Sequence, residues 1–193
     1  MKILEIWRDL ENNYAYKGDA DIILLYYLVR AFKPEVVLET GVAAGFSSAS
    51  ILEALKQNGG GILYSSDFPY LKMKNPEKYI GIMVEDRSDW NLYIRGDRKN
   101  IPKIVSQLKR IDLFHFDSDK SYQGREFVYK TIQKKLHDKS LLVFDDVSDN
   151  EFFIDYFGNS DFDYRILRRS RYSNKFVGIA CKDPNVISTL FRF

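Results

Sequence analysis

Three aspartates follow two apolar segments of the chain and could together hold a metal ion. Asp117 comes directly after Ile111–Phe116, and Asp145 and Asp146 come directly after Leu141–Phe144. Carboxylates that lie close together raise one another's pKa unless a cation or a proton lies among them. An all-oxygen set of ligands suits a hard cation such as Mg²⁺. The sequence therefore predicts a Mg²⁺ site at these aspartates; the alternative is that they only shape a pocket or are solvated.

A glycine turn and a downstream carboxylate predict a nucleoside-binding loop. The first apolar segment, Glu35–Leu38, runs into a turn in which Gly41 lets the backbone bend sharply and approach a ligand, and Gly45 lets a helix begin close to the sheet. Asp67 follows the second apolar segment, where nucleoside-binding folds place the acceptor for the ribose hydroxyls. The turn lacks the full G-x-G-x-x-G pattern of dinucleotide-binding folds. Two alternatives stay open: a glycine turn that serves chain geometry alone, and an aspartate that only caps a turn or helix.

A sheet must bring these residues together, and the apolar pattern predicts one. Short apolar runs rich in branched and aromatic residues are typical of strands buried on both faces. Helical patterns separate the runs, and this alternation predicts a mainly parallel, doubly wound sheet with helices on both faces. The predicted strands are Glu35–Leu38, Gly61–Ser65, Leu92–Ile94, Ile111–Phe116 and Leu141–Phe144, and the helices are Ser47–Leu55, Ile101–Leu108 and Gly124–Leu136.

The two ends of the chain have different patterns. Residues 3–32 predict two helices, and the second, Asp19–Phe32, ends before Pro34 because the residue before a proline disfavours helix. Aromatic alternation around Phe162–Leu167 and Phe176–Cys181 predicts a hairpin, which adds two edge strands, at least one antiparallel, to make a seven-stranded sheet. We therefore expect a Rossmann-like α/β fold in a single domain over residues 1–193, with N-terminal helices at 1–32 and a core at 33–182.

Composition excludes several classes of protein. The 193 residues are 45% apolar and 29% charged, which is typical of globular rather than disordered or fibrous chains. Cys181 is the single cysteine, so a disulfide framework and a cysteine-rich zinc site are excluded. The net charge of +2 gives no support to nucleic-acid binding. The longest apolar run, Ile22–Val29, is too short to cross a bilayer and the N-terminus lacks a secretory pattern, so we expect a cytoplasmic protein without a membrane partner.

Five segments follow one another in a specific order: VVLETGVAAGFSS from Val36, SSDFP from Ser65, IRGD from Ile94, IDLFHFDSDKSYQG from Ile111 and LLVFDDV from Leu141. Together they resemble the motif series of class I S-adenosylmethionine-dependent methyltransferases. The resemblance is strongest to the small-molecule O-methyltransferases of the methyltransferase domain 24 group and to relatives of catechol O-methyltransferase. It covers about residues 18–182, and an ordered series is more specific than any single motif.

The resemblance implies a set of cofactor contacts. Residues of the glycine turn would line the methionine part of S-adenosylmethionine, Asp67 would hold the ribose hydroxyls, and Gly96 with Asp97 would lie beside the adenine. One position departs from the family pattern, since Ala43 stands where a glycine is frequent. The predicted cofactor-binding residues are Glu39, Gly41, Ala43, Gly45, Ser47, Asp67, Gly96, Asp97 and Asp117.

The resemblance also implies roles in catalysis for Asp117 and Lys120. In catechol-type enzymes an aspartate after this strand and an Asp-Asn or Asp-Asp pair after the next hold a divalent ion, and a lysine three residues after the first aspartate is the general base. The domain 24 group often has histidine at that position, so Lys120 departs from it. Burial, a nearby sulfonium and a metal ion would lower the pKa of Lys120 toward neutrality. The alternative is a solvated lysine at the start of the next helix.

The leading hypothesis is therefore O-methylation of a small hydroxylated acceptor, such as a sugar or a secondary metabolite, by an enzyme that could be a homo-oligomer. A nicotinamide-dependent oxidoreductase is the second hypothesis, against which the incomplete glycine pattern and Glu39 count. A non-catalytic cofactor-binding protein is the third, although Asp67, Asp97 and Asp117 are all present. Nucleic-acid methylation is disfavoured because the chain has no Asn-Pro-Pro-Tyr type motif.

Other polar groups carry weaker hypotheses. His115 is expected to be a hydrogen-bonded core residue, and His137 a surface residue at a helix end. The aromatic stretch Phe152–Phe157 is expected to pack in the core and to form one wall of a substrate pocket. A cluster of cations around the hairpin is expected either to be solvated or to bind an anionic substrate; it comprises Arg165, Arg168, Arg169, Arg171 and Lys175.

Overall fold

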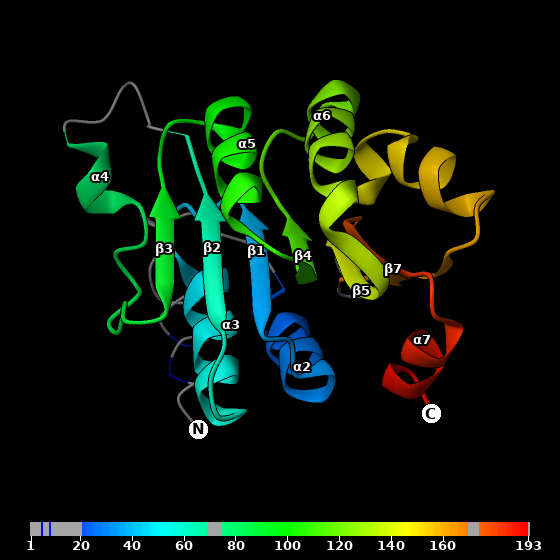
Figure 1. The fold of residues 1–193 in the computed structure, drawn as a ribbon, viewed down its shortest axis with the longest axis horizontal. Helices are drawn as coiled ribbons and strands as arrows, with labels where there is room; N and C mark the ends of the chain where they lie inside the picture. Colours follow the sequence, from blue (N-terminus) through cyan, green and yellow to red (C-terminus); the bar gives the residue numbers. More distant parts are fainter. Residues whose placement is uncertain (1–4, 6–7, 9–20, 69–74, 170–173, 193) are drawn as a thin grey trace.

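Seven strands form one sheet at the centre of the molecule (Figure 1). The computed structural model describes residues 5, 8, 21–68, 75–169 and 174–192. The strands lie in the order β3-β2-β1-β4-β5-β7-β6, so the chain order changes direction between β1 and β4. Ligands of open α/β sheets bind at such a switch point, beyond the carboxyl ends of the strands. The strands are β1 (Val36–Thr40), β2 (Ile62–Ser66), β3 (Trp90–Tyr93), β4 (Ile111–Phe116), β5 (Leu136–Phe144), β6 (Asp163–Arg168) and β7 (Phe176–Cys181).

The sheet is parallel from β3 to β5 and antiparallel in its last two pairs. The mainly parallel seven-stranded sheet and the C-terminal hairpin are thus confirmed. The prediction that both hairpin strands lie at the edge is wrong, because β7 pairs with β5 as well as with β6. Val177–Cys181 of β7 are all buried, as an internal strand requires, whereas β6 is partly exposed along its length.

Helices cover both faces of the sheet, as predicted. Successive strand residues point to opposite faces, so Val37 and Leu38 of β1 belong to two different hydrophobic cores. The first core packs α2 (Ile22–Phe32), α3 (Phe46–Gln57) and α7 (Pro184–Leu190) against the sheet. The second core packs α5 (Asp97–Gln107) and α6 (Tyr122–Ile132) against the other face. A short helix, α4 (Pro76–Tyr79), follows β2.

Several element boundaries differ from the predicted ones. The helix predicted to reach Leu136 ends at Ile132, because Leu136 already pairs with Ile111 in the sheet. His137 therefore lies in β5 rather than at a helix end, and its Nε2 is 3.0 Å from Oδ1 of Asp112. The first predicted N-terminal helix lies mostly outside the described residues. Helix α7 was not predicted, and α5 begins at Asp97 rather than near residue 101.

An aromatic cluster fills the second core. Phe152, Phe153 and Phe157 are fully buried, and each packs on the ring of Phe144 with centroids 5.6 to 5.9 Å apart. The last residues of this segment form a π-helix, Ile154–Gly158. The predicted core-packing role of the segment is confirmed, and its role as a substrate-pocket wall stays a prediction.

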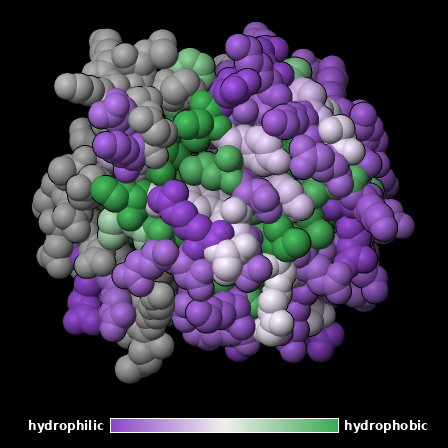
Figure 2. All heavy atoms as spheres, turned by 60° about the vertical axis from the view of Figure 1, so that its left-hand side comes forward, coloured by the Kyte–Doolittle hydropathy of each residue, from purple (hydrophilic) through white to green (hydrophobic). Residues whose placement is uncertain are grey.

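The surface is mainly hydrophilic on the side that carries α4 and β3, with apolar residues gathered in a few patches near its middle (Figure 2). The exposed apolar residues of the molecule include Phe68, with 56% of its surface accessible. No helix in the described ranges is both long and apolar enough to span a membrane.

Candidate functional site

A cavity of about 690 Å³ lies beyond the carboxyl ends of β1, β2, β3 and β4. Cavities that hold small molecules and cofactors usually enclose ~300–1,000 Å³. Glu39 and Gly45 do not line this cavity, whereas the other predicted cofactor-binding residues do, namely Gly41, Ala43, Ser47, Asp67, Gly96, Asp97 and Asp117. The cavity is also lined by residues that the sequence analysis did not select: Val42, Phe46, Phe68, Arg95, Arg98, Lys99, Ser118 and Asp119.

The glycine turn is shaped by contacts within the protein. Gly41 has φ +81°, and a Cβ atom at this position would lie 2.2 Å from the carbonyl oxygen of Asp117. Gly45 has φ +93°, and its Cβ would lie 2.8 Å from the Cα of Gly81, so Gly45 admits a close approach of that segment rather than of the sheet. Ala43 has φ +48°, in the left-handed region that favours glycine. This conformation accounts for the family's frequent glycine at that position.

Asp67 ties the end of β2 to the glycine turn. Its Oδ2 accepts hydrogen bonds from the backbone N–H groups of Val42 (3.1 Å) and Ala43 (2.7 Å), and its Oδ1 accepts one from the N–H of Phe68 (2.6 Å). Burial raises the pKa of Asp67 above its ordinary value, although these N–H groups oppose the shift. The carboxylate that was predicted to hold the ribose is therefore at the cavity wall and fixed by the loop that would surround the cofactor.

Asp97 joins two strand ends at another part of the same cavity. Its two oxygens accept hydrogen bonds from the hydroxyls of Ser66 and Ser118, each at 2.5 Å. Burial raises its pKa, and the two hydroxyls oppose the shift. Gly96 has φ +80°, and its Cβ would lie 2.9 Å from the ring of Phe68. The sequence analysis did not select Phe68 for the cavity wall. Its position could have indicated this role, because Phe68 is an aromatic residue directly after the strand-end carboxylate of Asp67, where the chain leaves the sheet.

Glu39 is buried beneath the cavity rather than in its wall. Its Oε2 accepts hydrogen bonds from the hydroxyls of Ser48 (2.6 Å) and Ser65 (2.8 Å), while its Oε1 has no hydrogen-bond partner. Oε1 instead faces Nδ1 of His115 at 3.6 Å. Although burial opposes the charged imidazole, Glu39 raises the pKa of His115 above its ordinary value. The expectation that His115 is a hydrogen-bonded core residue is wrong at Nδ1, which lacks a hydrogen bond.

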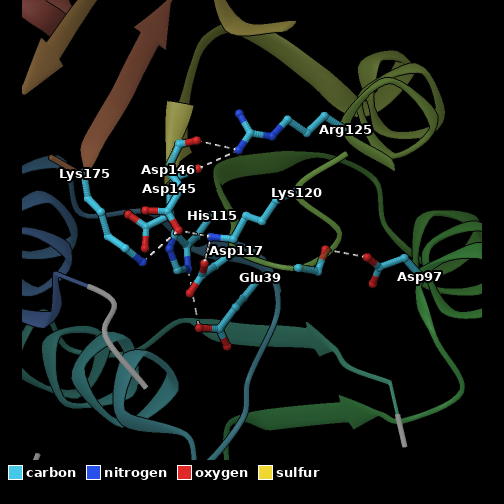
Figure 3. Close-up of polar contacts among 10 residues, drawn as sticks. Glu39, Asp97, His115, Asp117, Lys120, Arg125, Asp145, Asp146 and Lys175 are labelled. Atoms are coloured by element: carbon cyan, nitrogen blue, oxygen red, sulfur yellow. Dashed lines mark hydrogen bonds and ion pairs between the residues drawn. The ribbon is translucent and has the colours of Figure 1, made fainter. Parts of the chain in front are cut away.

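The predicted acidic residues come together around Lys120 (Figure 3). The ammonium of Lys120 donates to Oδ1 of Asp117 and, at 2.8 Å, to Oδ2 of Asp146. Lys175, at the start of the hairpin's second strand, also reaches Oδ2 of Asp146, at 3.3 Å. Burial acts to lower the pKa of Lys120, but the carboxylates outweigh it and raise the pKa above its ordinary value. The expected lowering of this pKa depends on a sulfonium and a metal ion beside the amine, and it stays a prediction.

Asp145 differs from its neighbour Asp146. Burial and the charge of Asp117 raise the pKa of Asp145 to about 6, and its Oδ2 has no hydrogen-bond partner. Burial acts in the same direction on Asp146, but Lys120 and Lys175 outweigh it and lower that pKa. A ring nitrogen of His115 and one oxygen each from Asp117 and Asp145 lie within 4.8 Å of one another. The described part of the chain thus contains a group of side chains that could hold a cation.

Arg125 fixes the backbone under the acidic residues, and the sequence analysis did not select it. Its side chain is fully buried, and Nη2 donates to the carbonyl oxygens of Asp145 (3.1 Å) and Asp146 (2.8 Å). Arg125, Val128 and Ile132 share the buried face of α6. This helical spacing could have indicated from the sequence that Arg125 is buried. A cation among apolar residues on the buried face of a helix needs a polar partner inside the protein.

Neither Tyr122 nor the described hairpin cations line this cavity. Tyr122 packs edge-on against Phe152 and donates to Asp155 at 3.1 Å, so it does not line the cavity. Of the hairpin cations, Lys175 points at the acidic residues, whereas Arg165 pairs with Asp163 on β6. Arg171 lies outside the described residues.

The comparisons with known proteins agree with this arrangement. The model of the methyltransferase domain 24 family matches residues 38–147, which contain most of the site. No curated protein sequence is detectably similar to the chain.

Solved structures of low sequence identity share the fold. An O-methyltransferase from Bacillus cereus, in complex with S-adenosylhomocysteine, has a TM-score of 0.68 at 15% identity, over 93% of this chain and 90% of that one. TomG from Streptomyces achromogenes, an O-methyltransferase of tomaymycin synthesis in complex with S-adenosylmethionine, has a TM-score of 0.67 at 16% identity, over 93% and 87%. CalS11, a TDP-rhamnose 3'-O-methyltransferase, has a TM-score of 0.64 at 19% identity, over 88% and 85%.

Proposed function

Because the chain belongs to the methyltransferase domain 24 family, whose members use S-adenosylmethionine, we propose that it transfers the methyl group to an oxygen of a small hydroxylated acceptor. The observation that supports the cofactor most directly is the cavity of about 690 Å³, in which the turn at Gly41 faces the strand-end carboxylate of Asp67. In this proposal the protein holds the sulfonium methyl in line with the acceptor oxygen, which converts a two-body encounter into a positioned reaction.

The residues assigned to the cofactor follow the cavity wall. Asp67 would accept hydrogen bonds from the ribose hydroxyls, and the exposed ring of Phe68 would lie against the adenine together with Gly96. Ser47 and the turn at Gly41 would surround the methionine part. Glu39 is assigned an indirect role, because it lies below the wall and holds Ser48 and Ser65.

For proton removal we assign Lys120, with Asp117 beside it. The ion pairs of Lys120 with Asp117 and Asp146 raise the pKa of its amine and keep it protonated. A base role therefore requires these two ion pairs to open when cofactor and acceptor bind. Asp146 would then keep its ion pair with Lys175.

The chemistry of the donor set fits a divalent ion. Buried oxygens without a hydrogen-bond partner, Oδ2 of Asp145 and Oδ1 of Asp146, lie close to Asp117 at the same edge of the sheet. Asp117, Asp145 and Asp146 would hold the ion, which when bound lowers the pKa of a coordinated hydroxyl and stabilises the oxyanion. Addition of a chelator should abolish turnover and Mg²⁺ should restore it; unchanged turnover in EDTA would leave the carboxylates with a scaffold role only.

The acceptor class rests on the family and on two structural neighbours. CalS11 is named for its action on TDP-rhamnose, and TomG for its part in tomaymycin synthesis. We propose a sugar or secondary-metabolite hydroxyl for this chain as well, with the hairpin that carries Lys175 near the acceptor.

The cofactor assignment is tested by calorimetry with S-adenosylhomocysteine and, separately, with NAD. Heat of binding with S-adenosylhomocysteine alone is the expected result, with a dissociation constant in the micromolar range. Binding of NAD alone would support the oxidoreductase hypothesis instead. Transfer of a labelled methyl group from S-adenosylmethionine to a panel of sugar nucleotides and phenols would then identify the acceptor.

A further inference from the structure

We propose that His115 is a nitrogen ligand of the divalent ion, held in position by Glu39, and that the site therefore prefers Mn²⁺ and related transition metals to Mg²⁺. This inference rests on the metal part of the proposed function and adds a residue that the all-oxygen prediction did not include. It also gives Glu39, which does not line the cofactor cavity, a role in the site.

The sheet register places the four side chains together. Glu39 of β1 lies directly opposite His115 of β4, and His115 lies opposite Val143 of β5. Asp117 is two residues after His115, and Asp145 is two residues after Val143. Alternate strand residues share a face, so these acidic and imidazole groups project from three neighbouring strands toward one point at the carboxyl edge.

The buried atoms around this point are incompletely satisfied. His115, Glu39 and Asp145 are each at most 2% exposed. Nδ1 of His115, Oε1 of Glu39 and Oδ2 of Asp145 all lack a hydrogen-bond partner. A buried polar atom without a partner costs about 1–3 kcal/mol, so the fold carries an unfavourable free energy here. A cation bonded to Oδ2 of Asp145 would offset part of that cost.

Glu39 is placed to orient the imidazole. Its Oε2 is fixed by the hydroxyls of Ser48 and Ser65, which leaves Oε1 pointing at Nδ1 of His115, 3.6 Å away. Histidines that bind metals usually donate their second ring N–H to a carboxylate, which fixes the ring and the tautomer. A proton on Nδ1 facing Glu39 would leave Nε2 free of a proton and able to bind the ion.

The ligand spacing and type select the metal. The three ligand atoms lie within 4.8 Å of one another, and ligands around a common ion at ~2.1 Å are about 3–4 Å apart, so small side-chain rotations close the site. Mg²⁺ prefers oxygen ligands, whereas imidazole suits first-row transition ions. An imidazole beside the carboxylates is therefore expected to make the site bind Mn²⁺, a first-row transition ion, more tightly than Mg²⁺.

The experiment measures the metal itself rather than turnover. Metal-free protein is titrated with MnCl₂ and with MgCl₂ by calorimetry, for the wild type, His115→Gln, Glu39→Gln and the control His137→Gln. His137 is the other histidine of the chain and lies at Asp112, away from the cluster. Pulsed electron paramagnetic resonance of the Mn²⁺-loaded protein then detects a directly bound nitrogen, and protein labelled with ¹⁵N in histidine alone identifies it as imidazole.

The expected result is a histidine nitrogen coupling in the wild type and in His137→Gln that is lost in His115→Gln. His115→Gln should weaken Mn²⁺ binding at least ~10-fold, and Glu39→Gln by ~10–100-fold. If Mn²⁺ and Mg²⁺ bind equally and no histidine coupling appears, the inference is overturned while the all-oxygen site stands. If neither ion binds, both the inference and the metal part of the proposed function fail. If His115→Gln does not fold, the coupling retained in His137→Gln still assigns the nitrogen to His115, because the chain has two histidines.

Discussion

Buried carboxylates at the two edges of the sheet have pKa values shifted in different directions. At the amino edge, Asp112 accepts hydrogen bonds from the N–H groups of Glu35 and Val36 and pairs with Arg110 and His137. Burial acts to raise its pKa, but these partners outweigh it and lower the pKa. At the carboxyl edge, burial prevails at Asp67, Asp97, Asp117 and Asp145, and each pKa is raised, whereas Lys120 and Lys175 lower the pKa of Asp146. Burial of a carboxylate alone therefore does not mark a functional edge; burial that the protein leaves uncompensated does.

The largest expected effect is on catalysis at Lys120. Replacing Lys120 with Ala removes the assigned base and should lower kcat by about 10²–10⁴-fold while leaving S-adenosylhomocysteine affinity nearly unchanged. Lys130→Ala is the matched control, because Lys130 pairs with Glu126 on the exposed part of α6. Steady-state kinetics and calorimetry together check the prediction. Equal kcat in the two variants would show that the lysine at the carboxyl edge only neutralises charge.

Gly41→Ala should have the largest effect on folding. The added Cβ would meet the carbonyl oxygen of Asp117 at 2.2 Å in a backbone with φ +81°. Left-handed strain and overpacking together should cost about 3 kcal/mol or more. Thermal or urea unfolding measures the loss, and Gly59→Ala is the control, since no atom lies within 4 Å of a Cβ there. If Gly41→Ala is as stable as Gly59→Ala, the glycine turn must be able to move away from Asp117 and remove the clash.

Asp145 and Asp112 should respond to pH in opposite directions. The folded-state pKa of Asp145, about 6, exceeds an unfolded value near 3.9. The folded state thus binds the extra proton, and the contribution of Asp145 to stability falls as pH rises from about 4 to about 6, by up to about 3 kcal/mol. Asp145→Asn should be more stable than wild type at pH 7.5 in EDTA.

Asp112 provides the opposite sign. Its lowered pKa means that stability is present above pH ~4 and is lost as pH falls below it, so Asp112→Asn should be less stable than wild type at pH 7.5. Urea unfolding at pH 4 and pH 7.5 tests both. If Asp145→Asn and Asp112→Asn both raise or both lower the free energy of unfolding at pH 7.5, the proposed difference between the two edges is wrong.

Asp67→Ala should weaken S-adenosylhomocysteine binding by about 2 kcal/mol, because it removes the acceptor of charged hydrogen bonds from the ribose. Some of this loss would come from the turn, since Asp67 also holds the N–H groups of Val42 and Ala43. Asp67→Asn separates the two effects by keeping one acceptor oxygen. Calorimetric affinity unchanged in both variants would remove Asp67 from the cofactor site.

The sequence predicted the strands at the carboxyl edge better than the charges on them. Strand β4 was predicted at its observed bounds, because Ile111–Phe116 is apolar throughout and bounded by charged residues. The early end of α6 was missed because the pairing of Leu136 with Ile111 is a tertiary contact. Most of the predicted cofactor-binding residues line the cavity.

The sequence predicted that these acidic residues lie near one another, but it did not predict their partners. Spacing brings Asp117 and Asp145 to one edge, yet it does not show that Lys175, directly before β7, reaches Asp146 or that Arg125 turns inward. The direction of the Lys120 pKa shift depends on those distances, which only the folded chain fixes. His115 illustrates the same limit, since its alternation with Asp117 was visible while its contact with Glu39 was not.

Trp90 is connected to this edge through a run of buried hydrogen bonds. Its indole N–H donates to Oγ of Ser65 at 2.8 Å, and Ser65 donates to Glu39, which faces His115. Tryptophan emission depends on the polarity and hydrogen bonding of the indole. The protein therefore contains an intrinsic optical reporter: fluorescence of Trp90, read in a Trp7→Phe background, follows events at Glu39 without any added label.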